Sequence, residues 1–284
     1  MVRSNWSGGS RGETAGCLAV ACATGWLAWS AAASGQTYTS LVFDDSLPEL
    51  IGQVPDLTAG ARYLFEDVAG GVDAEVEILT LENGAFLERI DDHGTAAPTD
   101  MFYPRLGGNP SQNPRVTFEV RLVDSITSEA EFLDFRWTLA DLDSSDGGSG
   151  TIFEVGILHD IGNYTLEGNP ADPTNLTRTT AQPGVHLFSS NPIVENFDDV
   201  DLTDTEVMVL VEYIATSTFR FGFGLEGTQI SNTRNVAASG LPSVLDNFAD
   251  PVETIVPEPG CTLLLGLAAL LPGRRRRNGA IPAP

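Results

Sequence analysis

The central part of this chain, residues 36–256, contains neither lysine nor cysteine. The cysteines of the chain are Cys17, Cys22 and Cys261. Without cysteine, the central part can form no disulfide and use no thiol chemistry. Without lysine, it can carry no Schiff-base amine and no lysine-dependent phosphate loop. Several classes of enzyme site are therefore excluded there.

Positive charge is also scarce in this central part. Residues 36–256 hold 9 Arg and 37 Asp plus Glu, so the formal charge is 9 minus 37, or −28. So acidic a surface repels nucleic acid and anionic lipid. It attracts cations, including calcium. The alternative is that the acidity only keeps the protein soluble.

The C-terminal end has three features in a fixed order. They are Pro257-Glu258-Pro259, an apolar run over residues 260–271, and the cluster Arg274, Arg275, Arg276 and Arg277. Four arginines resist transfer across a membrane, so they should stay on the cytoplasmic side and hold the preceding chain outside. As a helix rising about 1.5 Å per residue, the run covers roughly 18 Å, short of a hydrocarbon core of about 30 Å. The pattern predicts a short helix that anchors the chain transiently in the inner membrane.

This order of parts resembles the PEP-CTERM sorting signal of Gram-negative bacteria, which is read by a membrane enzyme called exosortase. The resemblance implies that an exosortase-type enzyme and the export machinery are partners, and that Pro257, Glu258 and Pro259 form the sorting motif with Arg274–Arg277. It implies a final location in the cell envelope, at the cell surface or in the extracellular matrix. An ordinary C-terminal anchor and a buried core helix are the alternatives.

The N-terminal end predicts export independently. Arg3 and Arg11 precede an apolar stretch over residues 17–33, and small residues follow up to Gly35. This is the pattern of a secretory signal peptide over residues 1–35, cleaved before Gln36. The expected organisation is then a single domain over residues 36–253 and a sorting tail over residues 254–284.

The body consists of short β runs separated by turn-rich loops. Along residues 116–123, for example, Val116 and Phe118 alternate with Thr117 and Glu119, as in a strand with one buried face. Further strands are predicted over residues 62–68, 74–81, 132–142, 151–158, 207–214 and 218–225, and Asn83-Gly84 predicts a turn. The run 207–214 is nearly continuously apolar, which favours a central strand. Residues 91–114 and 168–184 are polar and predict surface loops.

These features predict an all-β fold, an antiparallel β-sandwich of immunoglobulin-like or jelly-roll type. The body also resembles a β-rich module of bacterial surface proteins. The resemblance rests on Tyr63 and on the segments 71–74, 83–85, 90–92, 136–139, 141–143 and 219–235. It implies fold and location rather than an activity.

The best candidate for chemistry is the acidic segment Asp141-Leu-Asp143-Ser-Ser-Asp146-Gly147. Three carboxylates beside glycine are the hard oxygen ligands that calcium prefers, which makes Asp141, Asp143 and Asp146 a candidate calcium site. The segment departs from the EF-hand pattern, which needs glycine at its sixth position and glutamate at its twelfth. The simpler interpretation is an exposed hairpin loop. A second acidic cluster, residues 198–204, predicts a solvated loop.

No motif of an enzyme stands out. His93, His159 and His186 lack metal-ligand spacing, and each is expected to be a surface or turn residue. No Gly-x-Ser-x-Gly elbow is present. The sequence therefore predicts no enzyme and no cofactor other than calcium. It predicts a structural or binding protein of the cell envelope or extracellular matrix. The alternatives are a calcium-dependent carbohydrate-binding or adhesive module, with extracellular polysaccharide as partner, and a polysaccharide-acting hydrolase.

Overall fold

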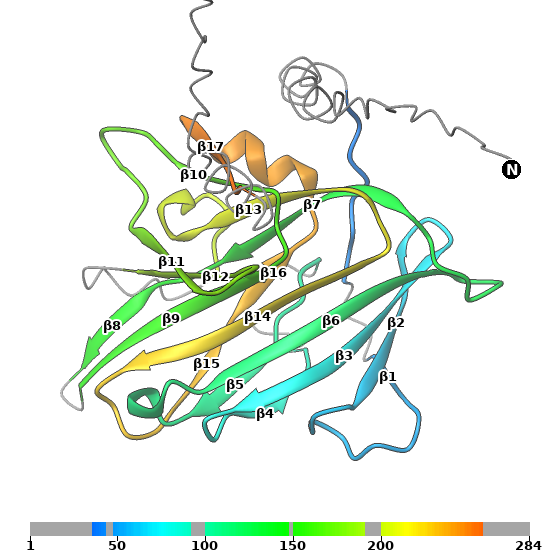
Figure 1. The fold of residues 1–284 in the computed structure, drawn as a ribbon, viewed down its shortest axis with the longest axis horizontal. Coiled ribbons are helices and arrows are strands. Elements are labelled where there is room, and N and C mark those ends of the chain that lie inside the picture. Colours follow the sequence, from blue (N-terminus) through cyan, green and yellow to red (C-terminus); the bar gives the residue numbers. More distant parts are fainter. Residues whose placement is uncertain (1–35, 44–47, 92–99, 148–149, 191–199, 258–284) are drawn as a thin grey trace, which may run out of the picture. The chain divides into compact units, whose positions relative to one another are not determined.

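A computed structural model describes residues 36–43, 48–91, 100–147, 150–190 and 200–257 (Figure 1). The chain divides into two units, residues 1–37 and 38–284, and the fold is that of the second unit. The predicted signal peptide, residues 1–35, and the predicted helix and arginine cluster of the tail lie outside the described residues. In the described part of the chain, no helix has the length and apolar character that crossing a membrane requires.

The largest sheet is antiparallel throughout and runs in the order β1-β2-β3-β6-β14-β9-β12-β11, with β8 also paired to β9 (Figure 1). Its strands are β1 (Glu49–Ile51), β2 (Arg62–Ala69), β3 (Val72–Glu82), β6 (Arg115–Asp124), β8 (Ser144–Gly147), β9 (Gly150–His159), β11 (Leu176–Gln182), β12 (Val185–Ser190) and β14 (Thr218–Gly227). Each of the seven strands that the sequence predicts overlaps a strand of this sheet or of the five-stranded sheet described next, although the predicted range 132–142 extends beyond β7 (Leu133–Ala140) and the range 207–214 begins before β13 (Val209–Thr216).

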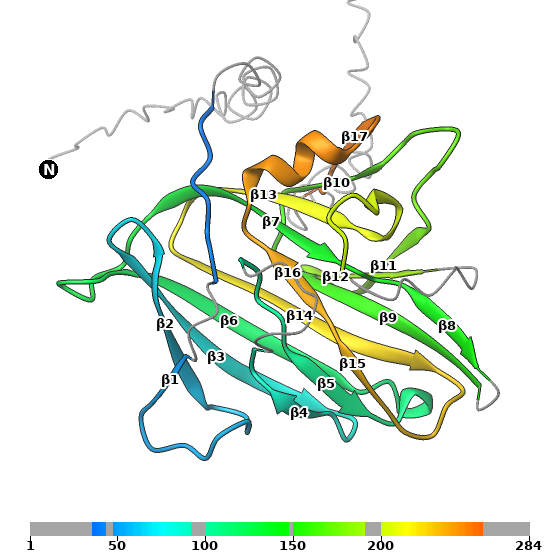
Figure 2. The same ribbon diagram turned by 180° about the vertical axis from the view of Figure 1, so that it is seen from behind.

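A five-stranded sheet, ordered β16-β7-β13-β10-β17, and a three-stranded sheet, ordered β15-β5-β4, complete the described fold. Their strands are β4 (Phe86–Arg89), β5 (Arg105–Gly108), β7 (Leu133–Ala140), β10 (Asn163–Glu167), β13 (Val209–Thr216), β15 (Asn232–Asn235), β16 (Ala237–Ser239) and β17 (Pro251–Ile255). Three short 3-10 helices are η1 (Pro110–Gln112), η2 (Thr205–Val207) and η3 (Pro242–Asn247). In both views η3 lies beside β13 and β17 (Figures 1 and 2).

The large and the five-stranded sheets pack face to face through an aromatic core. Trp137 of β7 lies with its ring centroid 4.9 Å from Phe221 of β14 and 5.6 Å from Phe43. Phe102 continues the cluster toward Phe118 of β6, at 5.2 Å. Buried aromatic rings contribute large apolar areas and favour the edge-to-face contacts seen here. The prediction of an antiparallel, all-β sandwich is confirmed.

The burial patterns of β6 and β13 explain why these two strands could be predicted from the sequence. On β6, Val116 and Phe118 are fully buried while Thr117 and Glu119 remain partly exposed, because alternate side chains point to opposite faces. β13 is apolar on both faces, since Val211 packs in the main core while Leu210 packs with residues of η3. It lies in the middle of its sheet, as its continuous apolar run predicted.

The structure corrects three expectations about architecture. Three sheets are found in the described residues, rather than the two sheets of an immunoglobulin-like domain or a jelly roll. The predicted loop 91–114 contains β5 and η1, and the predicted loop 168–184 contains β11. β5 is rich in glycine and β11 in polar residues, so their strand structure follows from pairing with β4, β15 and β12 rather than from a local pattern.

Candidate functional site

The predicted calcium segment follows β7 and then forms β8, which pairs with β9 in register Ser144 to Phe153. Residues 144–147 therefore form one strand of the β8–β9 hairpin, whereas the simpler interpretation expected an exposed loop that joins β7 to β9. β7 lies in the five-stranded sheet, and Asp143 is only 2% exposed. Asp141 occupies the left-handed backbone region, with φ 59°, where the chain turns out of β7. The side chain of Asp146 lies outside what the structure describes.

A glutamate that the sequence interpretation missed faces these aspartates. Glu154 of β9 is 2% exposed, and its Oε2 atom has no hydrogen-bond partner. Its Oε1 atom lies 3.7 Å from the Nε atom of Arg234 on β15. Burial raises the pKa of Glu154 well above its ordinary value, and the charges of Asp143 and Asp141 raise it further, while Arg234 opposes them. The sequence signal that could have identified Glu154 is its place as an acid among the apolar residues of the predicted strand 151–158.

This acidic cluster, Asp141, Asp143, Glu154 and Arg234, sets three carboxylates against one guanidinium. Arg234 also donates through Nη2 to Ser145 Oγ of β8. Among the side chains that the structure describes, no three His, Cys, Asp or Glu residues are arranged to hold one metal ion. Calcium at Asp141, Asp143 and Asp146 therefore stays a prediction.

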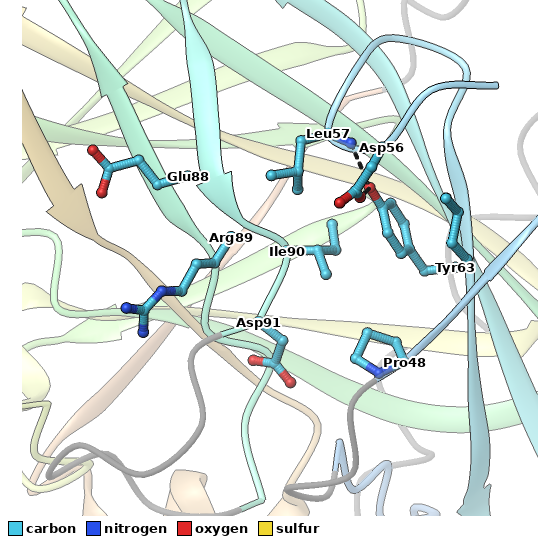
Figure 3. Close-up of a pocket in the computed structure, with 9 residues that line it drawn as sticks. Pro48, Asp56, Leu57, Tyr63, Glu88, Arg89, Ile90 and Asp91 are labelled. Carbon is cyan, nitrogen blue, oxygen red and sulfur yellow. Dashed lines mark hydrogen bonds between the residues drawn. The ribbon is translucent and has the colours of Figure 1, made fainter.

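A second candidate site is a pocket of about 420 Å³ beside β1, β2 and β4 (Figure 3). A cavity of this size is within the range of small-molecule sites. Its lining residues are Pro48, Leu50, Asp56, Leu57, Tyr63, Glu88, Arg89, Ile90 and Asp91. Sequence reasoning did not find it, because the lining comes from three separate segments that only the fold assembles.

Tyr63 holds one wall of this pocket in place. Its hydroxyl donates to Asp56 Oδ1 at 2.6 Å and accepts from the backbone N–H of Leu57 at 2.7 Å (Figure 3). Burial raises the pKa of Tyr63, and the hydrogen bond to Asp56 raises it further, so the hydroxyl remains protonated and can donate. The β1–β2 loop, in which Leu57 adopts φ 55°, is thereby tied to β2.

The other wall carries a buried aspartate. Asp91 is 7% exposed, and its Oδ1 atom accepts the backbone N–H of Tyr103 at 2.8 Å. Glu88 pairs with Arg105 at 3.1 Å. The pocket therefore combines apolar side chains with carboxylates that are already held by hydrogen bonds.

The two described histidines lie on neighbouring strands. His159 of β9 pairs in register with Val185, and the next residue, His186, is only 4% exposed. Arg178 Nε donates to His186 Nδ1 at 3.2 Å. Burial lowers the pKa of both histidines, so they are uncharged at neutral pH. The expectation that His186 is a surface or turn residue was wrong. His93 lies outside the described residues.

A hydrolase would need two carboxylates with opposed pKa shifts in one cleft. Glu154 and Glu167 are two buried glutamates with opposed shifts, since the pKa of Glu154 is raised and that of Glu167 is lowered to about 2. Neither of them lines the pocket, and both oxygens of Glu167 accept hydrogen bonds from the protein itself. These two residues do not form such a pair in the pocket.

Of the predicted sorting motif, only Pro257 is described. The backbone N–H of Val256 donates to the carbonyl of Gly162 at 2.9 Å, so sheet pairing extends to the residue before the motif. The expected boundary after residue 253 falls inside β17. Glu258, Pro259 and Arg274–Arg277 lie outside the described residues.

No protein-family model matches the chain, and no curated protein matches it either. Among solved structures, it is similar to the adhesin domain of PrgB from Enterococcus faecalis, with 13% identity and a TM-score of 0.40 over 64% of this chain and 61% of that one. The glucan binding protein C of Streptococcus mutans is 11% identical, with a TM-score of 0.40 over 72% and 64% of the two chains. The N-terminal domain of the Streptococcus gordonii adhesin Sgo0707 is 12% identical, with a TM-score of 0.40 over 72% and 52%.

The similarity thus spans less than two thirds of each of these three chains. At such low identity and TM-score, what those adhesins bind is a property of those proteins and is not transferred to this one.

Proposed function

We propose that this protein is exported and delivered by its C-terminal sorting signal to the cell surface or extracellular matrix, where the β-rich body serves as a binding or structural component. The observation that carries the proposal is the order of Pro257-Glu258-Pro259, the apolar run 260–271 and Arg274–Arg277.

The test is cell fractionation of the full chain in a Gram-negative host with and without an exosortase-type enzyme. The intact chain should leave the inner membrane only when that enzyme is present. Replacing all four arginines, Arg274–Arg277, by glutamine should remove the cytoplasmic anchor and change the distribution between membrane and external fractions. An unchanged distribution in both comparisons would contradict the sorting proposal.

A calcium-dependent adhesive module is the second candidate, and Glu154 is the observation that favours it. Its Oε2 atom has no hydrogen-bond partner, and its charge interacts with those of buried Asp143 and half-buried Asp141, although these three described side chains are not already arranged as a metal site. A divalent cation would balance the excess of carboxylates over the single guanidinium. At 100 times its dissociation constant, one calcium ion should add about 2.7 kcal/mol to the unfolding free energy, several degrees in melting temperature.

The calcium candidate is tested by melting the full chain in excess calcium and in chelator. The rise in melting temperature should disappear in Asp143→Asn and persist in Asp246→Asn, which removes one exposed acid elsewhere. Equal melting temperatures with calcium and with chelator would exclude the calcium site.

A further inference from the structure

The pocket beside β1, β2 and β4 presents apolar and acidic groups together. Leu57 and Ile90 flank the Tyr63 hydroxyl, and Leu50 adds a side chain that is 40% exposed (Figure 3). Apolar side chains are best matched by the aliphatic part of a ligand, whereas carboxylates are best matched by a cation or a hydrogen-bond donor. A ligand that satisfies both has an aliphatic stem and a positively charged end.

The carboxylates that would meet this charged end are fixed before binding. Asp56 Oδ1 accepts the Tyr63 hydroxyl at 2.6 Å, and Asp91 Oδ1 accepts the Tyr103 N–H at 2.8 Å. Groups that are already ordered lose less conformational freedom on association, so more of the interaction appears as affinity. The hydrogen bond from Tyr63 uses only Oδ1 of Asp56, and the residue is solvent-exposed, so its second carboxylate oxygen is accessible to a ligand.

The charges of the residues in and around the pocket indicate that the ligand is positively charged. The lining holds three acids, Asp56, Glu88 and Asp91, and one cation, Arg89, and Glu88 pairs with Arg105 outside the lining, which leaves an excess of one negative charge. In Figure 3 the guanidinium of Arg89 extends away from Tyr63 and Asp56. Since residues 36–256 carry a formal charge of −28, the surrounding field also attracts cations and repels anions.

The lack of an exposed aromatic face among the described lining residues limits which kind of cationic ligand fits the pocket. A saccharide ring is commonly met by an exposed aromatic face, but Tyr63, the one aromatic residue among the described lining residues, is only 2% exposed. An ammonium group needs no such face, because it is a compact donor of three hydrogen bonds on a flexible aliphatic stem.

We propose that this pocket binds the side chain of lysine from a basic partner protein, with the stem on Leu50, Leu57 and Ile90 and the ammonium at Asp56. The lysine site rests on the binding role proposed above for the β-rich body, and it specifies the chemical group that the partner would supply. The chain itself contains no lysine, so a second copy cannot supply this side chain. The partner is therefore a different, lysine-bearing polypeptide.

The test is binding of a short, end-blocked Gly-Lys-Gly peptide to the full chain, measured by calorimetry at low salt. Matched peptides replace the lysine by norleucine, acetyl-lysine or arginine, and glucosamine serves as the saccharide amine. The lysine peptide should bind best and weaken as salt is added, because part of the interaction is exposed to screening. Asp56→Asn should weaken it about 10-fold, since it removes a charged hydrogen bond.

The matched control is Asp246→Asn, which removes the same charge from exposed η3 outside the pocket. Equal weakening by the two variants would overturn the proposal in favour of general charge attraction. Equal binding of the norleucine peptide, stronger binding of the arginine peptide or of glucosamine, or no binding of the lysine peptide would overturn it too. The fractionation experiment does not involve the pocket. A negative result in fractionation would contradict only the sorting proposal, and a negative result in calorimetry would contradict only the lysine-binding proposal.

Discussion

Glu154 and Glu167 are both buried in the described fold, at 2% and 3% exposure, yet their pKa values move in opposite directions. Burial disfavours the charged form of both. At Glu167 it is outweighed by donors from Thr205 Oγ1, at 2.8 Å, and from the backbone N–H groups of residues 169, 249 and 250, so the pKa falls to about 2. At Glu154, one oxygen has no partner and neighbouring aspartates add repulsion.

The comparison teaches that hydrogen-bond donors, rather than depth, decide whether a buried carboxylate is charged. It also separates two kinds of region. Glu167 joins β10 to η2 and to the segment before β17, so it acts as a structural clamp. Glu154 belongs to the acidic cluster, where negative charge is in excess.

The largest effect is expected from Glu167→Gln. The amide cannot accept four hydrogen bonds, so the variant should lose about 3 kcal/mol of unfolding free energy at pH 7, given a shift from 4.5 to about 2. Because the folded pKa is depressed, this stabilisation is complete above pH 4.5 and is lost as pH falls toward 2. Urea unfolding from pH 3 to pH 7 measures it. The exposed Glu66→Gln is the control, and a loss that did not shrink at pH 3 would contradict the assignment.

Arg234→Gln should have the next largest effect, a loss of about 2 kcal/mol at pH 7, because it removes the cation that opposes three carboxylates. The loss should be smaller at pH 4, where carboxyl groups take up protons. Urea unfolding at the two pH values tests this. A loss of equal size at both would mean that Arg234 contributes packing rather than charge.

Glu154→Gln should act in the opposite direction. A raised folded pKa means that ionisation is harder in the folded state, so stability falls as pH rises above the ordinary value of 4.5. The neutral amide removes this penalty, and we expect a gain of about 1 kcal/mol at pH 7 in chelator and no gain below pH 4.5. Thermal unfolding across this pH range checks it. Destabilisation that grew with pH would show that Glu154 is stabilised as a carboxylate.

The smallest effect is expected for a partly exposed glutamate of the large sheet, Glu119, whose side chain is 25% exposed. Glu119 pairs with Arg220 at 2.7 Å, but the arginine side chain is 51% exposed. Exposed ion pairs contribute little, so Glu119→Gln should change the unfolding free energy by less than about 0.5 kcal/mol. The change should vanish in 1 M salt, as urea unfolding at two salt concentrations would reveal. A change of 2 kcal/mol or more would break the distinction between buried and exposed acids.

The seven predicted strands were found from local pattern because each carries enough apolar residues in its own segment. β6 alternates over residues 115–122, and β13 is nearly continuously apolar. β5 and β11 were missed, since glycine and threonine give no such pattern and their strand structure depends on neighbours distant in sequence.

The candidate sites show the same division. Asp141 and Asp143 were singled out because they are close in sequence. Glu154 was missed although it belongs to the same cluster, and the third partner, Arg234, is 80 residues further along the chain. The pocket is lined by three segments, around residues 48–50, 56–63 and 88–91, which no spacing rule connects.

The amino-acid sequence by itself determined the all-β class, the strongly acidic and lysine-free body, and the three successive sequence features of the C-terminal tail. These are properties of composition and of neighbouring residues. Only the tertiary structure decided which acids are buried, which of them find hydrogen-bond donors and where a pocket forms. Those properties depend on strand pairing between distant segments, and the donors around Glu167 alone come from residues 169, 205, 249 and 250.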